Sequence, residues 1–599
     1  MTMQLRVLGL VLASMTTLAC VVDSSPQPTS LDLSGFDQVS AELNLADISS
    51  FHVQLYATSP PGGGAPLFDS GCFPFEGKTF QLPPVAAGAD RSVRVHAFSA
   101  EDCAEETLIA VAYRGSLRVQ AEADRIYTLL PYAVHDFTAL PVPSLATMEK
   151  AESTECSSED FDEGMAQCQS EVHATAFCVQ GAGHCAMISL YPLNNYTPRV
   201  FAGAVALEDG QVSSLGGAGL QFAGGSFKGA ETNAEVYDPS TTWFEAPYIT
   251  NFTSMAPLVF HDVVHIGGQR AATIGGIEKF NLKKLGSDLV FETPVQNCGP
   301  DGSCVDNITS LLHVVDFEDQ SEMAAPMPRK VFGARGILIG AGPEARVLVA
   351  GGVIGDAQGG TVEQIDKVSV CTIGEKTINC NNLDEKLSNK RFGHDVVCVD
   401  EADDGSCHRV LIVGGYSTSS QRAADFYHTE SETLSSLAAT EDIPMAGGWE
   451  WVVVRNEEGE QQIYSFGGTT GNLGSTANVP PYRVSLTENG LAFEELNVDH
   501  PRLHRTFHQV VALPDNTILV IGGLDKNNEV TDSVLHFSAT GELLDELFLR
   551  IPRAGHTATL VTDGPLGGGV LVQGGIYLTD GSPAFVGGAE MYLSGAISQ

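Results

Sequence analysis

Seven short apolar segments in the C-terminal two-thirds of the chain each end at a pair of glycines. The second glycines of these pairs are Gly217, Gly268, Gly352, Gly415, Gly468, Gly523 and Gly575. Most of the intervals are roughly fifty to sixty residues, and a fixed period of this size is typical of repeat proteins. The residues before each pair are rich in leucine and β-branched side chains, so each unit is predicted to contain a strand rather than a helix.

A second strand with an aromatic or aliphatic anchor follows most of the glycine pairs. Its clearest copy is residues 234–239, followed by Trp243, and weaker copies are residues 277–280, 424–427, 534–537 and 589–592. Three units also share an Arg-x-x-His step: Arg391 and His394, Arg505 and His508, Arg553 and His556. A residue that recurs in a repeat usually does the same work in every copy. We therefore interpret the step as a cap or a hydrogen-bonding contact between units, and the alternative is that it lines a binding channel.

The double glycine followed by a tyrosine and a tryptophan resembles the kelch repeat, over about residues 190–599. The resemblance implies an all-β chain, with a seven-bladed kelch-type β-propeller preceded by a smaller domain. Propellers host many unrelated activities, so the fold alone does not predict the function. The last blade has no outer strand after residues 589–593. We expect residues 186–191 to supply that strand and so to join the two ends of the ring.

The N-terminus has the three parts of a secretory signal. Arg6 precedes an apolar stretch, residues 7–15, and small residues lead to Cys20, which predicts a signal peptide over residues 1–19. Residues 17–20 resemble a bacterial lipobox, which implies that Cys20 is lipidated and that residues 20–30 link the chain to a membrane. By the same resemblance we expect an outer-membrane or cell-surface lipoprotein. The alternatives are the inner membrane, a periplasm-facing position, or cleavage and release.

The cysteines support export. The chain has thirteen cysteines, and twelve remain when Cys20 is set aside. Close pairs in an exported chain predict disulfides across local loops. The candidates are Cys72 with Cys103, Cys298 with Cys304, Cys371 with Cys380, Cys398 with Cys407, and the group Cys156, Cys168, Cys178 and Cys185, whose pairing is left open. A zinc site in that group is an alternative that the lack of a CxxC spacing disfavours.

Residues 31–145 alternate between apolar and polar as strands do. Phe51, Val53 and Leu55 fall on one face of a strand, and residues 93, 95 and 97 repeat the pattern. This predicts a small β-sandwich, and residues 80–98 resemble the immunoglobulin-like and transthyretin-like modules of bacterial surface lipoproteins. An acidic connector with cysteines, residues 146–189, leads to the propeller, which we place at residues 190–599.

The chain is strongly acidic, with 32 basic and 74 acidic residues and a net charge of −42. Such a chain repels phosphate backbones, which argues against nucleic acid as a partner. Denser acidic runs occur at residues 149–162 and 400–404. We interpret these runs as solvated surface. Calcium binding in the second run is the alternative, although no EF-hand spacing is present.

Motifs of known catalytic chemistry are missing: the sequence has no G-x-S-x-G elbow, zinc-protease histidine pair or phosphate loop. Tyr427 and His428 are the residue types that bind copper in kelch oxidases of the galactose oxidase type, but Tyr427 occupies the structural anchor position. We therefore predict no metal or cofactor, and a membrane-anchored binding or scaffolding module with a protein or glycan ligand. It would contact the membrane through its lipid alone.

The alternative is an exported carbohydrate-active enzyme, a hydrolase or an oxidase, with its site at the propeller mouth. Carboxylates or histidines that converge at one end of the channel would favour the enzyme. An apolar or aromatic loop face without perturbed groups would favour binding.

Overall fold

The computed structural model describes residues between 29 and 595, apart from internal gaps. The longest gaps are residues 33–46, 140–164, 190–198, 238–248 and 438–445. The described part is nearly all-β, as the sequence predicts, and its elements are strands apart from the short 3₁₀ helix Glu105–Thr107. Within this part, none of the helical structure is long and apolar enough to span a bilayer. Trp243 lies outside the described residues.

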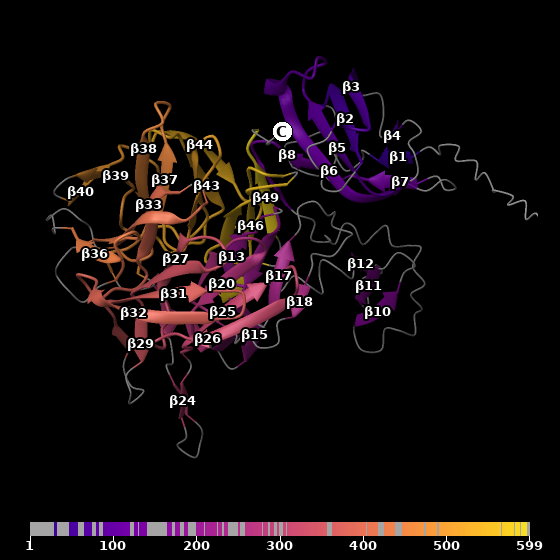
Figure 1. Ribbon diagram of the computed structural model, residues 1–599. Coiled ribbons are helices and arrows are strands. Elements are labelled where there is room, and N and C mark those ends of the chain that lie inside the picture. The colour runs from indigo at the N-terminus through magenta and orange to yellow at the C-terminus, as the bar shows by residue number, and fades with distance from the viewer. Residues whose placement is uncertain are drawn as a thin grey trace, which may run out of the picture.

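Seven four-stranded antiparallel sheets, here called sheets 1 to 7, follow one another along the chain (Figure 1). Sheets 1 to 4 are β13–β14–β17–β18 (Gly203–Ala206, Val212–Leu215, Asn233–Tyr237, Ile249–Asn251), β19–β20–β25–β26 (Asp262–His265, Arg270–Ile274, Leu311–Asp316, Ser321–Pro326), β27–β28–β31–β32 (Arg335–Gly340, Ala345–Ala350, Lys367–Ile373, Ile378–Lys386) and β33–β34–β35–β36 (Asp395–Glu401, Cys407–Val413, Asp425–His428, Thr433–Ser436). Sheets 5 to 7 are β37–β38–β39–β40 (Glu450–Arg455, Gln461–Phe466, Tyr482–Thr487, Gly490–Glu495), β41–β42–β43–β44 (Gln509–Ala512, Ile518–Ile521, Ser533–Phe537, Leu543–Phe548) and β45–β46–β49–β9 (Thr557–Leu560, Gly569–Gln573, Ala589–Leu593, Phe137–Ala139).

The glycine pairs join each sheet to the next. The second strand of every sheet ends at a pair, and the second glycine donates its N–H to a carbonyl in the segment that leads into the following sheet. Gly468 N–H, for example, donates to Arg505 O at 2.7 Å. The last bond returns to the start, because Gly575 N–H donates to Arg199 O, ahead of sheet 1, at 2.8 Å. The first strands also contact one another in order, and β45 contacts β13. The seven sheets therefore form a closed ring.

The prediction for the second unit is wrong in two respects. The glycine pair that plays the repeat role there is Gly275–Gly276, at the end of β20, and Gly276 N–H donates to Val331 O at 2.8 Å. Gly267 and Gly268 instead form the turn of the β19–β20 hairpin. The anchor strand of this unit is β25, not residues 277–280, because β25 is the strand that pairs with β20.

The strand that completes sheet 7 is also not the expected one. Strand β9 pairs antiparallel with β49, and Tyr592 lies opposite Phe137. Residues 185–189 form β12, which lies in a separate three-stranded sheet with β10 (Met165–Gln169) and β11 (Ala174–Val179). The ring is thus closed by a strand that precedes the connector rather than by one that follows it.

Ahead of the ring, two sheets share one hydrophobic core. The first is β3–β2–β5–β6–β8 (Phe68–Pro74, Ser50–Tyr56, Gly88–Phe98, Leu108–Val119, Pro131–Ala133), and the second is β4–β1–β7 (Thr79–Leu82, Thr29–Asp32, Arg125–Thr128). Phe51, Val53 and Leu55 of β2 are buried together with Leu31 of β1 and Leu82 of β4. A second cluster joins this region to the ring, because Val111 and Tyr132 pack with Met591 and Leu593 of sheet 7.

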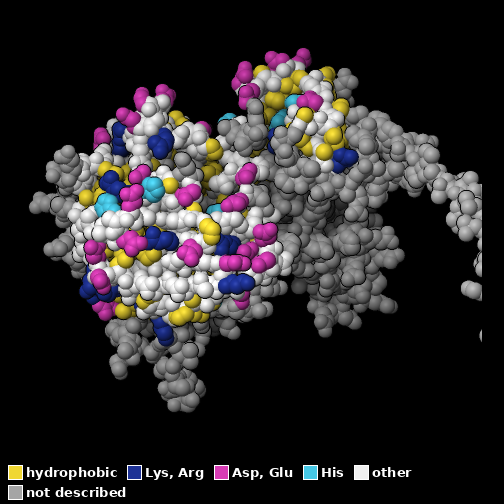
Figure 2. Space-filling view, viewed as in Figure 1, with side chains coloured by type: hydrophobic (Ala, Val, Ile, Leu, Met, Phe, Trp, Pro, Cys, Tyr) yellow, Lys and Arg dark blue, Asp and Glu magenta, His cyan; other side chains and the backbone are white. Residues whose placement is uncertain are grey.

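Further strands are inserted into the loops of the ring. They are the four-stranded sheet β15–β16–β21–β22 (Ala218–Ala223, Ser226–Gly229, Lys279–Leu285, Asp288–Glu292) and the hairpins β23–β24 (Gln296–Cys298, Cys304–Asp306), β29–β30 (Val353–Gly355, Val362–Gln364) and β47–β48 (Ile576–Thr579, Ser582–Phe585). On the face shown in Figure 2, acidic and basic side chains are interspersed rather than gathered in one patch.

Three of the predicted disulfides are present: Cys72–Cys103, Cys371–Cys380 and Cys398–Cys407. They indicate maturation in an oxidising compartment outside the cytoplasm. The backbone register also places Cys178 opposite Cys185 and Cys298 opposite Cys304. Cys20 and Cys156 lie outside the described residues. These further pairings and the lipidation of Cys20 stay predictions.

Candidate functional site: the central cavity

The arginine of the Arg-x-x-His step holds its own sheet together. Arg553 is fully buried, and its guanidinium donates to Gly574 O at 3.1 Å and to Glu590 of the third strand at 2.6 Å. Arg391 makes the same pair of contacts with Gly414 O and Asp425. Arg199, at the corresponding place in sheet 1, contacts Gly216 O and Glu235. Arg199 does not belong to an Arg-x-x-His step, because residue 202 is alanine, and so the repeated step does not reveal it.

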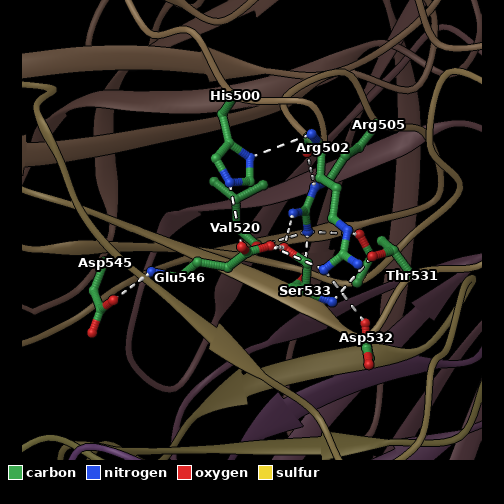
Figure 3. A network of polar contacts seen from close by, with 10 residues as sticks. His500, Arg502, Arg505, Val520, Thr531, Asp532, Ser533, Asp545 and Glu546 are labelled. Atoms are coloured by element: carbon green, nitrogen blue, oxygen red, sulfur yellow. Dashed lines mark hydrogen bonds and ion pairs between the residues drawn. The ribbon is translucent and has the colours of Figure 1, made fainter.

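Sheet 6 makes this contact through an extra residue (Figure 3). Its third strand has Ser533 where sheets 1, 4 and 7 have an acidic residue. Arg505 donates to Ser533 Oγ at 2.7 Å, and Ser533 Oγ donates to Glu546 of β44 at 2.5 Å. Glu546 also pairs with Arg502 and His500, at 3.1 and 3.3 Å. Burial lowers the pKa of Arg505 to about 9, while the charge of Glu546 opposes that shift.

The histidine of the step lies between two sheets. A Cβ atom built on Gly467 of sheet 5 would lie 2.3 Å from Cε1 of His508. His394 lies against Gly351, and His556 against Gly522, in the same way. The first glycine of these three pairs therefore leaves room for the imidazole that comes from the following sheet. Burial lowers the pKa of His508 to about 3, with a further contribution from Arg505, so its imidazole is neutral at neutral pH.

The residue before each histidine position has a positive φ in all seven units. Four units have glycine there, and three have phenylalanine: Phe201, Phe260 and Phe507, with φ of 56°, 53° and 53°. Side chains rarely adopt this conformation, and such outliers cluster at functional sites. The three rings lie together, with centroids 4.9 Å apart for Phe201 and Phe260 and 5.5 Å apart for Phe201 and Phe507.

The residue after each histidine position is the first residue of the first strand of its sheet. In order, these residues are Gly203, Asp262, Arg335, Asp395, Glu450, Gln509 and Thr557. Because the first strands lie side by side around the ring, their first residues meet at one end of it. Arg335 there lies 3.5 Å from Asp262 and 3.7 Å from Glu450. Asp395 accepts the N–H of Trp451, at the start of the neighbouring first strand, at 2.9 Å.

These charged residues perturb one another. Burial raises the pKa of Glu450 to about 8; Arg335 opposes the shift, and Asp395 and Asp262 add to it. Burial likewise raises the pKa of Asp395. Burial alone would lower the pKa of Arg335, but the three carboxylates raise it. The guanidinium therefore stays charged, while the Glu450 carboxyl is largely protonated at pH 7.

A cavity of about 660 Å³ opens at this end of the ring. Its wall includes Arg335, Glu450 and Gln509 from the first strands, and five phenylalanines and Tyr416 above them. The side chains of Arg335 and Glu450 are 35% and 24% accessible, although protein surrounds them, because the accessible part faces the cavity. The volume falls in the range of small-molecule sites.

The structure separates the predicted site residues. Arg391, Arg505 and Arg553 lie inside their sheets, whereas His508 and His556 reach the cavity wall through a small accessible fraction. Tyr427 is buried within sheet 4, and His428 contacts Ser435 of the outer strand at 2.9 Å, so neither faces the cavity. Asp404 of the second acidic run accepts from Ser406. Within the residues that the structure describes, no three His, Cys, Asp or Glu side chains are arranged to hold a metal ion.

Comparisons with known proteins find only structures of low similarity among those named here. No protein-family model matches the chain, and no curated protein matches it. A solved fungal alcohol oxidase of the AA5 family, in complex with copper, is 14% identical, with 67% of this chain and 76% of the oxidase covered and a TM-score of 0.45. A protein named YjhT is 10% identical, with 66% of this chain and 100% of YjhT covered and a TM-score of 0.34. Similarity this low supports no statement about substrate or reaction.

Proposed function

We propose that the seven sheets are the blades of a kelch-type β-propeller, and that the protein binds a small ligand, or one projecting residue of a protein or glycan, in the central cavity. The observation that carries the proposal is the convergence of Asp262, Arg335, Asp395 and Glu450 at the first position of neighbouring inner strands. Buried charges are costly unless they are paired or serve a ligand. Here one guanidinium faces three carboxyl groups, and two members of the cluster, Arg335 and Glu450, line an accessible cavity.

The proposal also covers the region ahead of the ring and the attachment of the protein to a membrane. We propose that it is a β-sandwich, since its two sheets share one core, and that export ends with lipidation of Cys20 and attachment to the outer membrane. Replacing Cys20 with serine should move the protein from the detergent phase to the aqueous phase on partitioning. Unchanged partitioning would exclude the lipid anchor.

A second candidate function is hydrolysis of a glycan. Glu450, with its raised pKa, could donate a proton to a leaving group, and a second carboxyl group, that of Asp262, lies in the same cluster around Arg335. Glycosidases use such a pair of carboxyl groups. Turnover of chromogenic glycosides by the wild-type chain, abolished by Glu450→Gln, would select this candidate over simple binding.

The test of ligand binding uses the full chain carrying Cys20→Ser, purified without detergent. Glycan, peptide and small-molecule libraries are screened by thermal shift, and each hit is titrated against wild type, Glu450→Gln and Glu494→Gln. The last variant makes the same change on the exposed face of β40. Binding in the cavity should weaken at least tenfold in Glu450→Gln and stay unchanged in Glu494→Gln. Equal affinity for all three proteins would show that the ligand binds elsewhere.

A further inference from the structure

Aromatic side chains form much of the cavity wall, and most of them remain partly accessible. Among the described residues, the aromatic side chains that line the cavity are Phe201, Phe260, Phe332, Phe392, Tyr416 and Phe507. The ring centroid of Phe201 lies 4.9 Å from that of Phe260 and 5.5 Å from that of Phe507. Those of Phe392 and Tyr416 lie 4.9 Å apart. A ligand that enters the cavity therefore meets ring surface on several sides.

Three of these rings are not required by the repeat. Phe201, Phe260 and Phe507 occupy a position of positive φ at which the other four units have glycine. A phenylalanine there holds a backbone conformation that costs free energy, and such costs are concentrated at functional sites. The three segments lead into sheets 1, 2 and 6, yet their rings contact one another in the cavity wall. We interpret these rings as side chains that serve a ligand.

The polar groups of the inner strands offer both donors and acceptors to the cavity. The terminal nitrogens of Arg335 lie 3.5 Å from Asp262 and 3.7 Å from Glu450, longer than the about 2.7–2.9 Å of a charge-assisted hydrogen bond. The guanidinium therefore keeps the capacity to donate to an oxygen of a ligand. Gln509 donates its amide N–H to His508 O at 3.0 Å, which leaves its carbonyl oxygen able to accept from a ligand.

The charges of the lining balance. The lining contains two basic and two acidic side chains: Arg335, Lys390, Glu363 and Glu450. Lys390 and Glu363 form an ion pair with each other. The Glu450 carboxyl is largely protonated at pH 7, because burial raises its pKa to about 8, and Arg335 interacts with carboxylates that lie outside the lining. The lining thus has no surplus of either sign to compensate an ionic ligand, and burying an uncompensated charge is costly.

A neutral ligand with a flat ring and one polar edge matches this wall. Its ring would pack against the phenylalanines in stacked or edge-to-face contacts. A primary amide presents a carbonyl acceptor and an N–H donor on one edge, which suits the mixed donors and acceptors of the inner strands. A sugar, in contrast, carries hydroxyl groups around its whole ring. Those that faced the phenylalanines would lose their hydrogen bonds to water without replacement.

We propose that the central cavity binds a neutral aromatic amide, a small molecule whose ring lies among the phenylalanines and whose amide edge contacts Arg335, Glu450 and Gln509. This inference rests on the proposed function, since it names the ligand class of the same cavity.

The test compares three compounds that share a benzene ring and a planar head group: neutral benzamide, anionic benzoate and cationic benzamidine. Each is titrated at pH 7 against the full chain carrying Cys20→Ser, with binding followed by calorimetry. Benzamide should bind at least tenfold more tightly than either ion. Acetamide, which has the amide but not the ring, should bind at least tenfold more weakly than benzamide.

Substitutions in the wall place the bound amide. Phe507→Gly and Phe260→Gly should each weaken benzamide binding at least fivefold, because each removes a ring from the wall. Both introduce the residue that four other units have at this position, and the second keeps the test decisive if the first does not fold. Glu450→Gln should weaken benzamide binding at least tenfold, as expected of any ligand of this cavity. Phe548→Ala removes an exposed ring from β44 and should leave the affinity unchanged.

The remaining outcomes separate the two proposals. An ion that binds as tightly as benzamide, or benzamide binding that survives both glycine substitutions, would overturn the amide inference. Failure of benzamide to bind, alongside a ligand from the library screen that loses affinity in Glu450→Gln, would also overturn it while leaving the proposed function intact. If no ligand from the screen responds to Glu450→Gln, both proposals fail.

Discussion

Because β9 closes the ring, truncating one side chain of this strand should destabilise the whole ring, even though β9 is far from the ring in the sequence. Phe137 is fully buried, and its ring lies 5.2 Å from that of Tyr592. It belongs to the core between sheets 6 and 7, where it packs with Val570 and Leu549. Replacing a buried phenylalanine with alanine costs about 3–5 kcal/mol, because apolar contact is lost and a cavity remains. Phe137→Ala should therefore destabilise the ring by about that amount, although residue 137 precedes the ring in sequence.

Urea unfolding followed by tryptophan fluorescence measures this effect, because Trp451 lies in β37 of sheet 5 and the buried Trp449 directly precedes that strand. Asp136→Asn is the neighbouring control. It removes a partly exposed ion pair with Arg550 and should cost about 0–1 kcal/mol. Ile188→Ala tests the strand that the sequence favoured for closure, and it should leave the transition of the ring unchanged. A loss below about 1 kcal/mol in Phe137→Ala, or an equal loss in Ile188→Ala, would refute closure by β9.

Two further predictions concern the contacts between sheets. Gly522→Ala should cost about 1–3 kcal/mol more than Gly459→Ala in the same unfolding assay, because both have positive φ but only at Gly522 would the new Cβ meet a carbonyl, Arg553 O, at 2.6 Å; equal costs would contradict the close approach. The pKa of His508, about 3, lies below the unfolded value of about 6.5, so the unfolded state binds a proton that the folded state does not. Stability should therefore fall by about 2 kcal/mol per such histidine between pH 7 and pH 5. His508→Asn should flatten that dependence, and an unchanged slope would show that this histidine is not buried in the neutral form.

The repeat could be predicted from the sequence because its constant residues act locally. An apolar segment that ends at two glycines predicts a strand and the close approach of another backbone, wherever the segment lies in the chain. The same pattern misled in the second unit, where residues before Gly267 and before Gly275 are both apolar. Only the tertiary contact separates them: a Cβ on Gly275 would lie 2.2 Å from Val331 O, whereas nothing lies within 4 Å of one on Gly267.

The closing strand and the cavity could not be predicted in this way. Pairing of β9 with β49 joins segments on opposite sides of the connector, and no local property of residues 137–139 specifies such a distant partner. The charged residues of the cavity were missed for a different reason. Asp395 directly follows the recurring His394, but its equivalents in the neighbouring units are Arg335 and Glu450, so a search for recurring residue types passes over them.

That difference between constant and variable positions explains where the site lies. Where a unit has them, the arginine stabilises its own sheet, and the glycine pair and the histidine join that sheet to its neighbour. The buried atoms of these residues contact protein. The first residues of the inner strands meet at one end of the ring, and three of them, Arg335, Glu450 and Gln509, line the cavity. Their side chains differ from unit to unit. Divergence at that position, from Gly203 to Arg335 to Glu450, is what a ring of equivalent sheets needs in order to build an asymmetric site. Chemistry in a repeat of this kind should therefore be sought at the positions where the units stop resembling one another and share one opening.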